Sequence, residues 1–266
     1  MPIVDCIIAL FVYVDDRMKD VPSHPQEILS PSELVTIGLL YALKGVGQTA
    51  FHRWLFHNYR HLFPHLPDRT RLFRRLAARQ DWTDRFLAED GFTHILWVPD
   101  IADSYGIELI HPRRQGRATN SEAKKGLSNQ RWIVGIKVCA VINHLGRVTE
   151  WQWQGANTHD KHFRPMIGSH AQSVVLTDLG FHGKSGDPEN LNVCKKGQCN
   201  ARFLIETVFS LWTGFLSLKK ITERETWHIQ SHLAFAIAAF NCIQEVFASK
   251  PDENGRIPLT MAGICL

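Results

Sequence analysis

Three acidic residues stand where a folded chain could bring carboxylates together on rigid elements. Asp178 directly follows the apolar run Val174–Thr177, which predicts a buried strand that ends in a carboxylate. Glu206 lies one helical turn after Arg202 in an apolar, helix-like segment, and Asp103 follows a strand-like stretch. Hard divalent cations prefer oxygen ligands, and carboxylates held on rigid elements can hold two metal ions for phosphoryl transfer. The pattern therefore indicates a two-metal site that acts on phosphate esters.

Each of these residues also fits an ordinary structural role. Asp178 could cap the element that follows its strand, and Arg202 could form a surface ion pair with Glu206 at the i, i+4 spacing of a helix. Asp160 could be a fourth acid near the metals, but a helix cap is the preferred interpretation. The residue types alone leave these explanations open.

The identity of the first acid is not fixed by its position. Asp100, Asp103 and Glu108 all lie around two strand-like stretches, His94–Pro99 and Ile107–Ile110, and the residues between them could form a bend or a bulge. The chemistry of a carboxylate does not choose among the three.

Length and composition are those of a folded protein with room for two domains. The chain has 266 residues, of which 44% are hydrophobic, and it lacks the apolar run of about 18 residues that a membrane span needs. The apolar start lacks a basic segment and carries Asp5, so no signal peptide is expected and the cytoplasm is the expected compartment. The six cysteines form no C-x-x-C pair, which favours reduced packing cysteines over a zinc site at Cys194, Cys199 and His182.

The net charge is only +4, but the basic residues are clustered. Such clusters suit contacts with DNA phosphates, although a solvated helix face or a polar loop would show the same composition. The second cluster lies in a Gly-, Ser- and Asn-containing segment with few apolar residues, so a nucleic-acid contact is favoured there. The candidate DNA-binding residues are Arg71, Arg74 and Arg75 in the first cluster and Arg113, Arg114, Arg117, Lys124, Lys125 and Arg131 in the second.

Hydrophobic spacing predicts a helical segment followed by an α+β segment. Residues 1–90 look helical, with Ser30 and Glu33 forming a capping box and a basic helix over residues 68–78. These helices could form a helix-turn-helix or a plain bundle. The elements expected from residue 92 onward are an antiparallel meander to residue 154 with a long polar loop over 111–130, a short helix over 158–167, strands over 173–178 and 190–195, and helices over 201–215 and 225–247.

Four segments, taken in order, resemble the DDE transposases of small bacterial insertion sequences. They are residues 103–117, 125–137, 176–182 and 202–206, and the resemblance covers roughly residues 30–245. It implies an RNase H-like core in which the first acid lies on the first strand, the second on the fourth strand and the last on a following helix. It also selects Asp103 over Asp100, because the family's first acid precedes a Ser or Thr. Arg202 matches the arginine of the family's C-terminal signature and joins the candidate DNA contacts.

The resemblance implies a complete organisation for the chain. We expect an α+β protein with a helical DNA-binding and dimerisation domain over residues 1–90. An RNase H-like core over 91–250, with a five-stranded mixed sheet flanked by helices, and a C-terminal tail over 251–266 would follow. Asp103, Asp178 and Glu206 would be the catalytic residues and would hold two Mg²⁺ (or Mn²⁺) ions.

The implied reaction is DNA strand cleavage and strand transfer at transposon ends. The implied partners are double-stranded DNA, as terminal inverted repeats and target DNA, and a second copy of the chain in a homodimer. The protein would associate with the bacterial nucleoid, with no membrane partner.

Two positions depart from the family's C-terminal signature. Cys199 stands where a Tyr is common, and Thr213 stands where a Lys is common, with Lys219 and Lys220 further on.

Three alternative functions stay open. They are an RNase H-like DNA nuclease without strand transfer, a catalytically silent DNA-binding derivative, and a helical protein-interaction domain on an unrelated α+β core. The three intact acids argue against the silent derivative.

Overall fold

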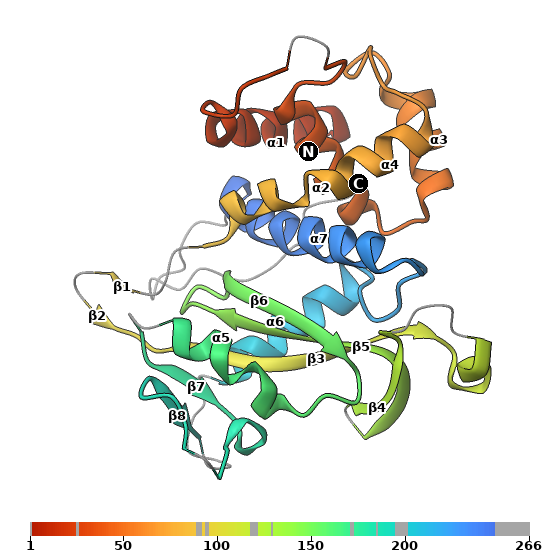
Figure 1. Ribbon diagram of the computed structural model, residues 1–266. Helices are drawn as coiled ribbons and strands as arrows, with labels where there is room; N and C mark the ends of the chain where they lie inside the picture. Colours follow the sequence, from red (N-terminus) through yellow and green to blue (C-terminus); the bar gives the residue numbers. More distant parts are fainter. Residues whose placement is uncertain are drawn as a thin grey trace. The chain divides into compact units, whose positions relative to one another are not determined.

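The computed structural model describes residues 2–24, 27–88, 92–93, 96–117, 122–128, 130–170, 173–184, 186–194 and 202–247. The chain divides into two compact units (Figure 1). One is built from the chain up to Phe86 and from Trp227 onward, and the other is Leu87–Thr226. The predicted tail over 251–266, Cys199 and the start of the predicted second domain at residue 91 lie outside the described residues.

The first unit is helical, as predicted. Ser30 caps the second helix in a capping box, because its hydroxyl accepts a hydrogen bond from the Glu33 N–H while the Glu33 carboxylate accepts one from the Ser30 N–H. Asp68 caps the basic fourth helix. The helices are α1 (Ile3–Met18), α2 (Pro31–Lys44), α3 (Gln48–Tyr59), α4 (Arg69–Ala78), the 3₁₀ segment η1 (Gln80–Phe86) and α7 (Thr226–Val246).

The position of α7 corrects the predicted domain boundaries. The sequence assigned residues 225–250 to the catalytic domain, but α7 packs with the N-terminal helices. The Phe235 ring fills the space that a Cβ on Gly38 of α2 would need. The rings of His232 and Tyr41 are also in contact, with 5.4 Å between their centroids. The Asn241 side chain donates a hydrogen bond to the Phe86 carbonyl at 3.0 Å. The apolar residues of a helix do not indicate which core the helix packs into. The prediction therefore placed α7 with the elements that precede it in the chain, and this was wrong.

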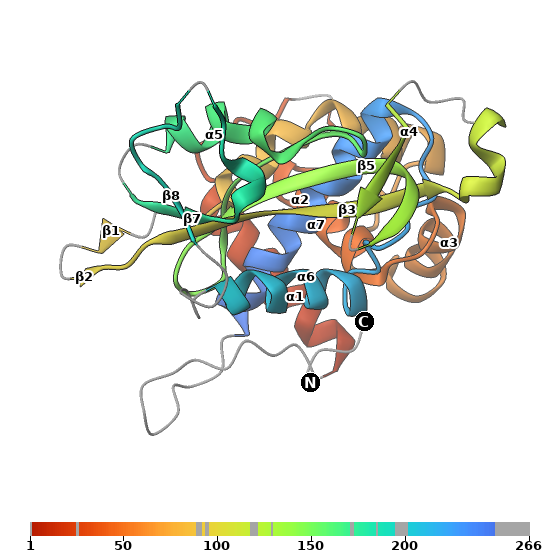
Figure 2. The same ribbon diagram turned by 90° about the horizontal axis from the view of Figure 1, so that it is seen from below.

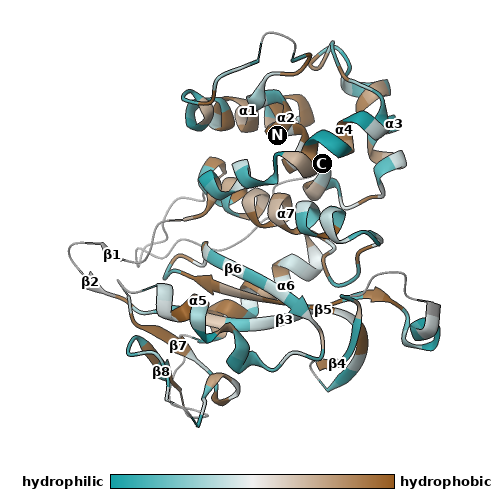
Figure 3. Ribbon diagram, viewed as in Figure 1, coloured by the Kyte–Doolittle hydropathy of each residue, from teal (hydrophilic) through white to brown (hydrophobic). Residues whose placement is uncertain are grey.

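The basic helix α4 is hydrophilic over much of its length (Figure 3). Arg71 and Arg74 are exposed, while Arg75 is half-buried beside a cavity of about 430 Å³ that Trp82 and Glu27 also line. None of the described helices is by itself long and apolar enough to cross a membrane. Only the bent pair of α2 and α3, which meet at 117°, passes that test jointly.

The second unit contains a mixed sheet covered by helices, which confirms the predicted α+β fold and is consistent with the RNase H-like core that the resemblance implies. The strands β3 and β7 are parallel neighbours at its centre, and β5 is antiparallel to β3. The sheet order is β4-β5-β3-β7-β8, with β6 also paired to β5. The strands are β3 (Asp100–Ile110), β4 (Lys124–Ser128), β5 (Arg131–Ile142), β6 (Val148–Gly155), β7 (Val175–Thr177) and β8 (Leu191–Val193), and β1 (Phe92–Thr93) and β2 (Leu96–Trp97) form a separate small hairpin.

Two local predictions in this unit were wrong. Residues 100–104, which could have formed a bend or a bulge, are instead part of the strand β3. This strand runs from Asp100 to Ile110 and pairs with β5 from Ile101 onward, with one irregularity between Glu108 and Ile110. The predicted polar loop over 111–130 contains the 3₁₀ segment η2 (Pro112–Arg117) and the edge strand β4, which makes six strands in the described sheet instead of five. Lysines on an edge strand prevent pairing with other chains and give it the composition of a loop.

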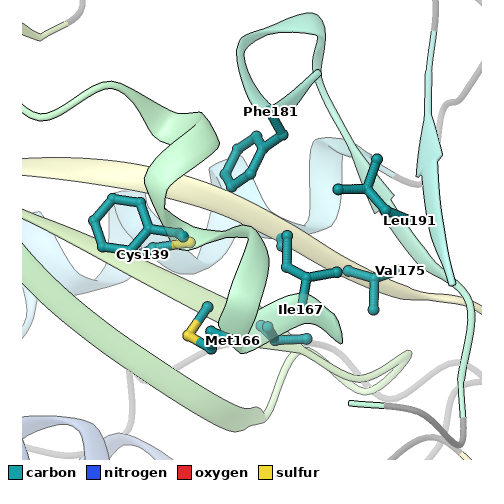
Figure 4. Packing of buried hydrophobic residues seen from close by; sticks show 9 residues of the cluster. Cys139, Met166, Ile167, Val175, Phe181 and Leu191 are labelled. Atoms are coloured by element: carbon teal, nitrogen blue, oxygen red, sulfur yellow. The ribbon is translucent and has the colours of Figure 1, made fainter. Parts of the chain in front are cut away.

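Helices cover the two faces of the sheet (Figure 2). The 3₁₀ segment η3 (Asp160–Phe163) and α5 (Arg164–Ser169) cover the face that carries Ala102. There Ile167, Val175 and Phe181 pack in one buried cluster (Figure 4). Strand side chains alternate, so Asp103 and Tyr105 point to the opposite face. That face is covered by α6 (Phe203–Gly214), since the Tyr105 ring lies 5.0 Å from Phe209.

Candidate active site

An open stretch along one edge of β3 creates the site. The 3₁₀ segment η4 (Leu179–Phe181) follows β7 after Thr177, so β7 pairs with β3 only at Asp100 and Ile101. Glu108 of β3 bonds through its backbone to Lys219 and Ile221, which occupy the same edge further along. Between these contacts the backbone N–H of Ser104 donates to the Asp103 carboxylate at 2.7 Å. A side chain thus satisfies a donor that a neighbouring strand would otherwise satisfy.

A cleft of about 610 Å³ lies against this open edge. The three acids predicted from the sequence all line it: Asp103 from β3, Asp178 from the end of β7 and Glu206 from α6. Their arrival from a central strand, its parallel neighbour and a covering helix agrees with the predicted order. The other lining residues are Ser104, Tyr105, Leu127, Ser128, Lys137, Asp160, Arg202, Phe209, Ser210, Thr213 and Lys219.

Asp103 is the most electrostatically perturbed acid of the cleft. Burial raises the pKa of Asp103 to about 6, and repulsion from Asp178 and Asp160 acts in the same direction. The hydrogen bond from the Ser104 N–H and the Arg202 guanidinium oppose that rise. The carboxyl is nevertheless 20% exposed and therefore reachable from the cleft. A carboxylate held among other carboxylates is stabilised by any added cation.

Asp178 caps the element that follows its strand and also lines the cleft. Its Oδ1 accepts a hydrogen bond from the Gly180 N–H at 2.8 Å, which caps η4, and the same residue lines the cleft. Gly180 has a steric reason to lack a side chain. A Cβ there would stand 2.9 Å from Asp178 Oδ1 and 3.0 Å from Asp160 Oδ2. The two carboxylates are therefore close to each other.

Asp160 corrects another prediction. It was interpreted as a helix cap, but His159 takes the cap position of η3 without a side-chain bond. The Asp160 carboxylate instead lies 3.0 Å from Lys137 Nζ and lines the cleft. The cap interpretation used neighbouring residues only, whereas the ion pair joins η3 to β5.

Arg202 and Glu206 do not act as the surface pair that the helical spacing allowed. Arg202 NH2 lies 3.4 Å from Asp103 Oδ2, across the cleft from α6 to β3. Glu206 is exposed on the first turn of α6. Asp103 therefore has a cationic neighbour of its own, and Glu206 remains open to the cleft.

The competing acids of β3 have other partners. Asp100 is fully buried, and it accepts a hydrogen bond from Ser173 Oγ at 2.6 Å and lies 2.8 Å from His170 Nε2. Glu108 is buried between Arg131 at 3.2 Å and Lys220 at 3.3 Å. Neither lines the cleft, so the choice of Asp103 agrees with the geometry.

Lys219 was not among the candidate residues and is a cation of the cleft wall. Its Nζ lies 4.8 Å from the centroid of the Tyr105 ring, and burial lowers the pKa of Lys219 while Arg131 adds to that effect. The Tyr105 hydroxyl is hydrogen-bonded to Thr213 Oγ1 at 2.6 Å. Thr213 itself therefore supports the aromatic wall and brings no charge.

The predicted DNA-binding residues of the second cluster lie on three elements, η2, β4 and the start of β5. Arg113 and Arg114 are exposed on η2, where Arg117 is the last residue. Lys124 and Lys125 are exposed on β4. Arg131 is 64% exposed, but its guanidinium is engaged by Glu108.

The chemistry of the acidic residues fits a hard divalent cation. The candidate ligands are carboxylate oxygens on or directly after rigid elements, which suits Mg²⁺ or Mn²⁺. Among the described residues, however, no three acid, His or Cys side chains converge closely enough to surround one ion. The four described cysteines, Cys6, Cys139, Cys194 and Cys242, are buried free thiols, as predicted for packing cysteines.

The chain matches no protein-family model, no curated protein and no solved structure.

Proposed function

We propose that the protein is an insertion-sequence transposase of the DDE type, which cleaves DNA strands and joins transposon ends to target DNA. One observation carries the proposal. Asp103, Asp178 and Glu206, selected from the sequence, come from a central strand, its neighbour and a helix to line one cleft of an RNase H-like unit. The class of reaction is metal-dependent phosphoryl transfer.

Each acid has a distinct task in this mechanism. Bound Mg²⁺ or Mn²⁺ would activate a water or a DNA 3′-hydroxyl and stabilise the leaving oxygen. Asp103 and Asp178 would hold the cations, and Glu206 would complete the ligand set from α6. With its pKa near 6, Asp103 is mostly ionised at neutral pH and can serve as a ligand. Arg202, at 3.4 Å, restrains its carboxylate.

The cations around the cleft suit a polyanionic substrate. Lys219 lies in the wall, and Arg113, Arg114, Lys124 and Lys125 are exposed on η2 and β4. Phosphate contacts of this kind position DNA without reading its sequence. Arg71 and Arg74 on α4 give the helical unit a second surface for terminal repeats. Action on paired ends would require two copies of the chain, as in a homodimer. A DNA substrate would place this homodimer at the nucleoid.

Cleavage of supercoiled plasmid carrying the element's own ends tests the proposal. With Mg²⁺, wild type should nick the ends and Asp178→Ala should not, while both bind the DNA. Glu225→Ala is the matched control, because Glu225 is an exposed acid outside the cleft. DNA that wild type binds but does not cut would overturn the enzymatic function and favour a silent derivative.

A joining assay separates the transposase from a nuclease of the same fold. A labelled end with a free 3′-hydroxyl should become joined to target plasmid in the presence of Mg²⁺. Cleavage without joining would favour the nuclease.

A further inference from the structure

The hairpin of β4 and β5 carries an exposed apolar pair. Trp132 is 57% exposed and Leu127 is 53% exposed, and their Cα atoms are partners across the hairpin. Folding leaves both side chains in water, so the pair contributes little to the core. Large apolar side chains that cluster in solvent are typical of a contact surface.

A cation beside this pair indicates what it contacts. Lys125 Nζ lies 5.2 Å from the centroid of the Trp132 ring, on the face of β4 that also carries Leu127. Arg131 is held by Glu108, so Lys125 supplies the positive charge beside the ring. An aromatic face next to an ammonium group matches a nucleobase next to its phosphate. A purely apolar protein partner would have to bury this charge at a cost.

The pair lies on the same side of the sheet as the catalytic acids. Side-chain alternation along β5 puts Trp132 on the face of Ala140, whose partner on β3 is Asp103. Leu127 lines the cleft together with Asp103. At about 3.3 Å per residue, Trp132 lies up to about 26 Å from Asp103 along the strand, or about eight DNA base steps of about 3.4 Å.

We propose that Trp132 stacks on an unpaired base of the DNA strand bound in the cleft, within about eight nucleotides of the scissile phosphate. Lys125 contacts a phosphate beside that base, and Leu127 packs against its edge. The base is unpaired because stacking inside a duplex covers both faces of every base. The proposal rests on the proposed function, since it needs DNA in the cleft.

Binding of defined strands to the full chain in EDTA tests the stacking without cleavage. The probes are a 20-nucleotide oligodeoxythymidine, the same strand with abasic sites, and a 20-base-pair duplex, each followed by fluorescence anisotropy. Trp132→Ala should weaken oligodeoxythymidine binding about tenfold, and Trp132→Phe should stay within about threefold of wild type. The abasic strand should bind wild type and Trp132→Ala equally.

The salt dependence separates the ring from its cation. Trp132→Ala should leave the slope of log affinity against log salt unchanged, whereas Lys125→Ala should reduce its magnitude by about 0.7. Trp227→Ala is the matched control, because Trp227 is 46% exposed outside the hairpin, and its affinity should equal that of wild type. Equal unfolding curves in urea would show that the variants fold.

Three outcomes are decisive. Equal affinity of wild type and Trp132→Ala for oligodeoxythymidine would overturn the stacking, even if Mg²⁺-dependent cleavage at the ends is intact. Unchanged DNA affinity with a weakened dimer in sedimentation would also overturn it and make the hairpin a contact between copies. The predicted tenfold loss in a protein that never cleaves would support the stacking and overturn the enzymatic function alone.

Discussion

Asp100 and Asp103 lie on the same strand and have opposite surroundings. Asp100 is fully buried, and its Oδ2 accepts a hydrogen bond from Ser173 and lies close to His170, so local donors match one of its two oxygens. Asp103 faces the cleft, and the acids Asp178 and Asp160 contribute to raising its pKa. A matched buried carboxylate holds structure together, whereas a carboxylate among carboxylates keeps repulsion that a cation relieves. The neighbours, and not the strand or the residue type, separate a structural acid from the proposed catalytic one.

Catalysis should show the largest difference between the two acids. Asp103→Asn should reduce Mg²⁺-dependent nicking of end-bearing DNA by at least about 10³-fold, because a proposed metal ligand loses its charge. Asp100→Asn should remain within about threefold of wild type per folded molecule. Single-turnover nicking, normalised to the folded fraction, measures both, and an equal loss in both variants would contradict the distinction.

Stability should show the reverse order. Asp100→Ala should lower the free energy of unfolding by about 3 kcal/mol, because His170 and Ser173 lose a buried acceptor. Asp103→Ala should cause no such loss. Urea unfolding at neutral pH compares the two, and a larger loss for Asp103→Ala would show that its partner Arg202 makes it a structural acid.

The pH dependence should show a smaller effect with a defined sign. The pKa of Asp103 is raised in the folded state, so its contribution to stability is complete below about pH 4 and is lost as pH rises through about 6. Asp103→Asn removes this loss. The variant should gain about 1–2 kcal/mol over wild type between pH 4 and pH 7 in urea unfolding. Glu225→Gln, which changes an exposed side chain, should show no such gain. If the stability of Asp103→Asn relative to wild type fell between pH 4 and pH 7, the predicted sign would be wrong.

The sequence was most informative where the signal is local and continuous. Asp178 at the end of a short apolar strand, the capping box at Ser30 and Glu33, and Glu206 on an apolar helix all follow from neighbouring residues. The choice of Asp103 over Asp100 came from the family resemblance, and their burial agrees with it.

The features that were missed depend on long-range partners. Asp160 pairs with Lys137 on another strand, and Lys219 enters the cleft because its backbone pairs with Glu108. The strand β4 was not predicted, because its two lysines and Gly126 give it the composition of a loop. A side chain at Gly126 would collide with the Ala156 carbonyl, so the glycine is required by a contact that local sequence does not reveal.

The shortness of β7 makes the site sensitive to insertions. β7 pairs with β3 at two positions before η4 begins at Leu179. Two added residues would preserve the alternation of its side chains, carry Asp178 about 7 Å further along β3 and pair the edge that now borders the cleft. A descendant of this gene could therefore keep every acidic residue and still lose its activity. Among related chains, the length of this one strand would reveal such a loss that a comparison of acids would overlook.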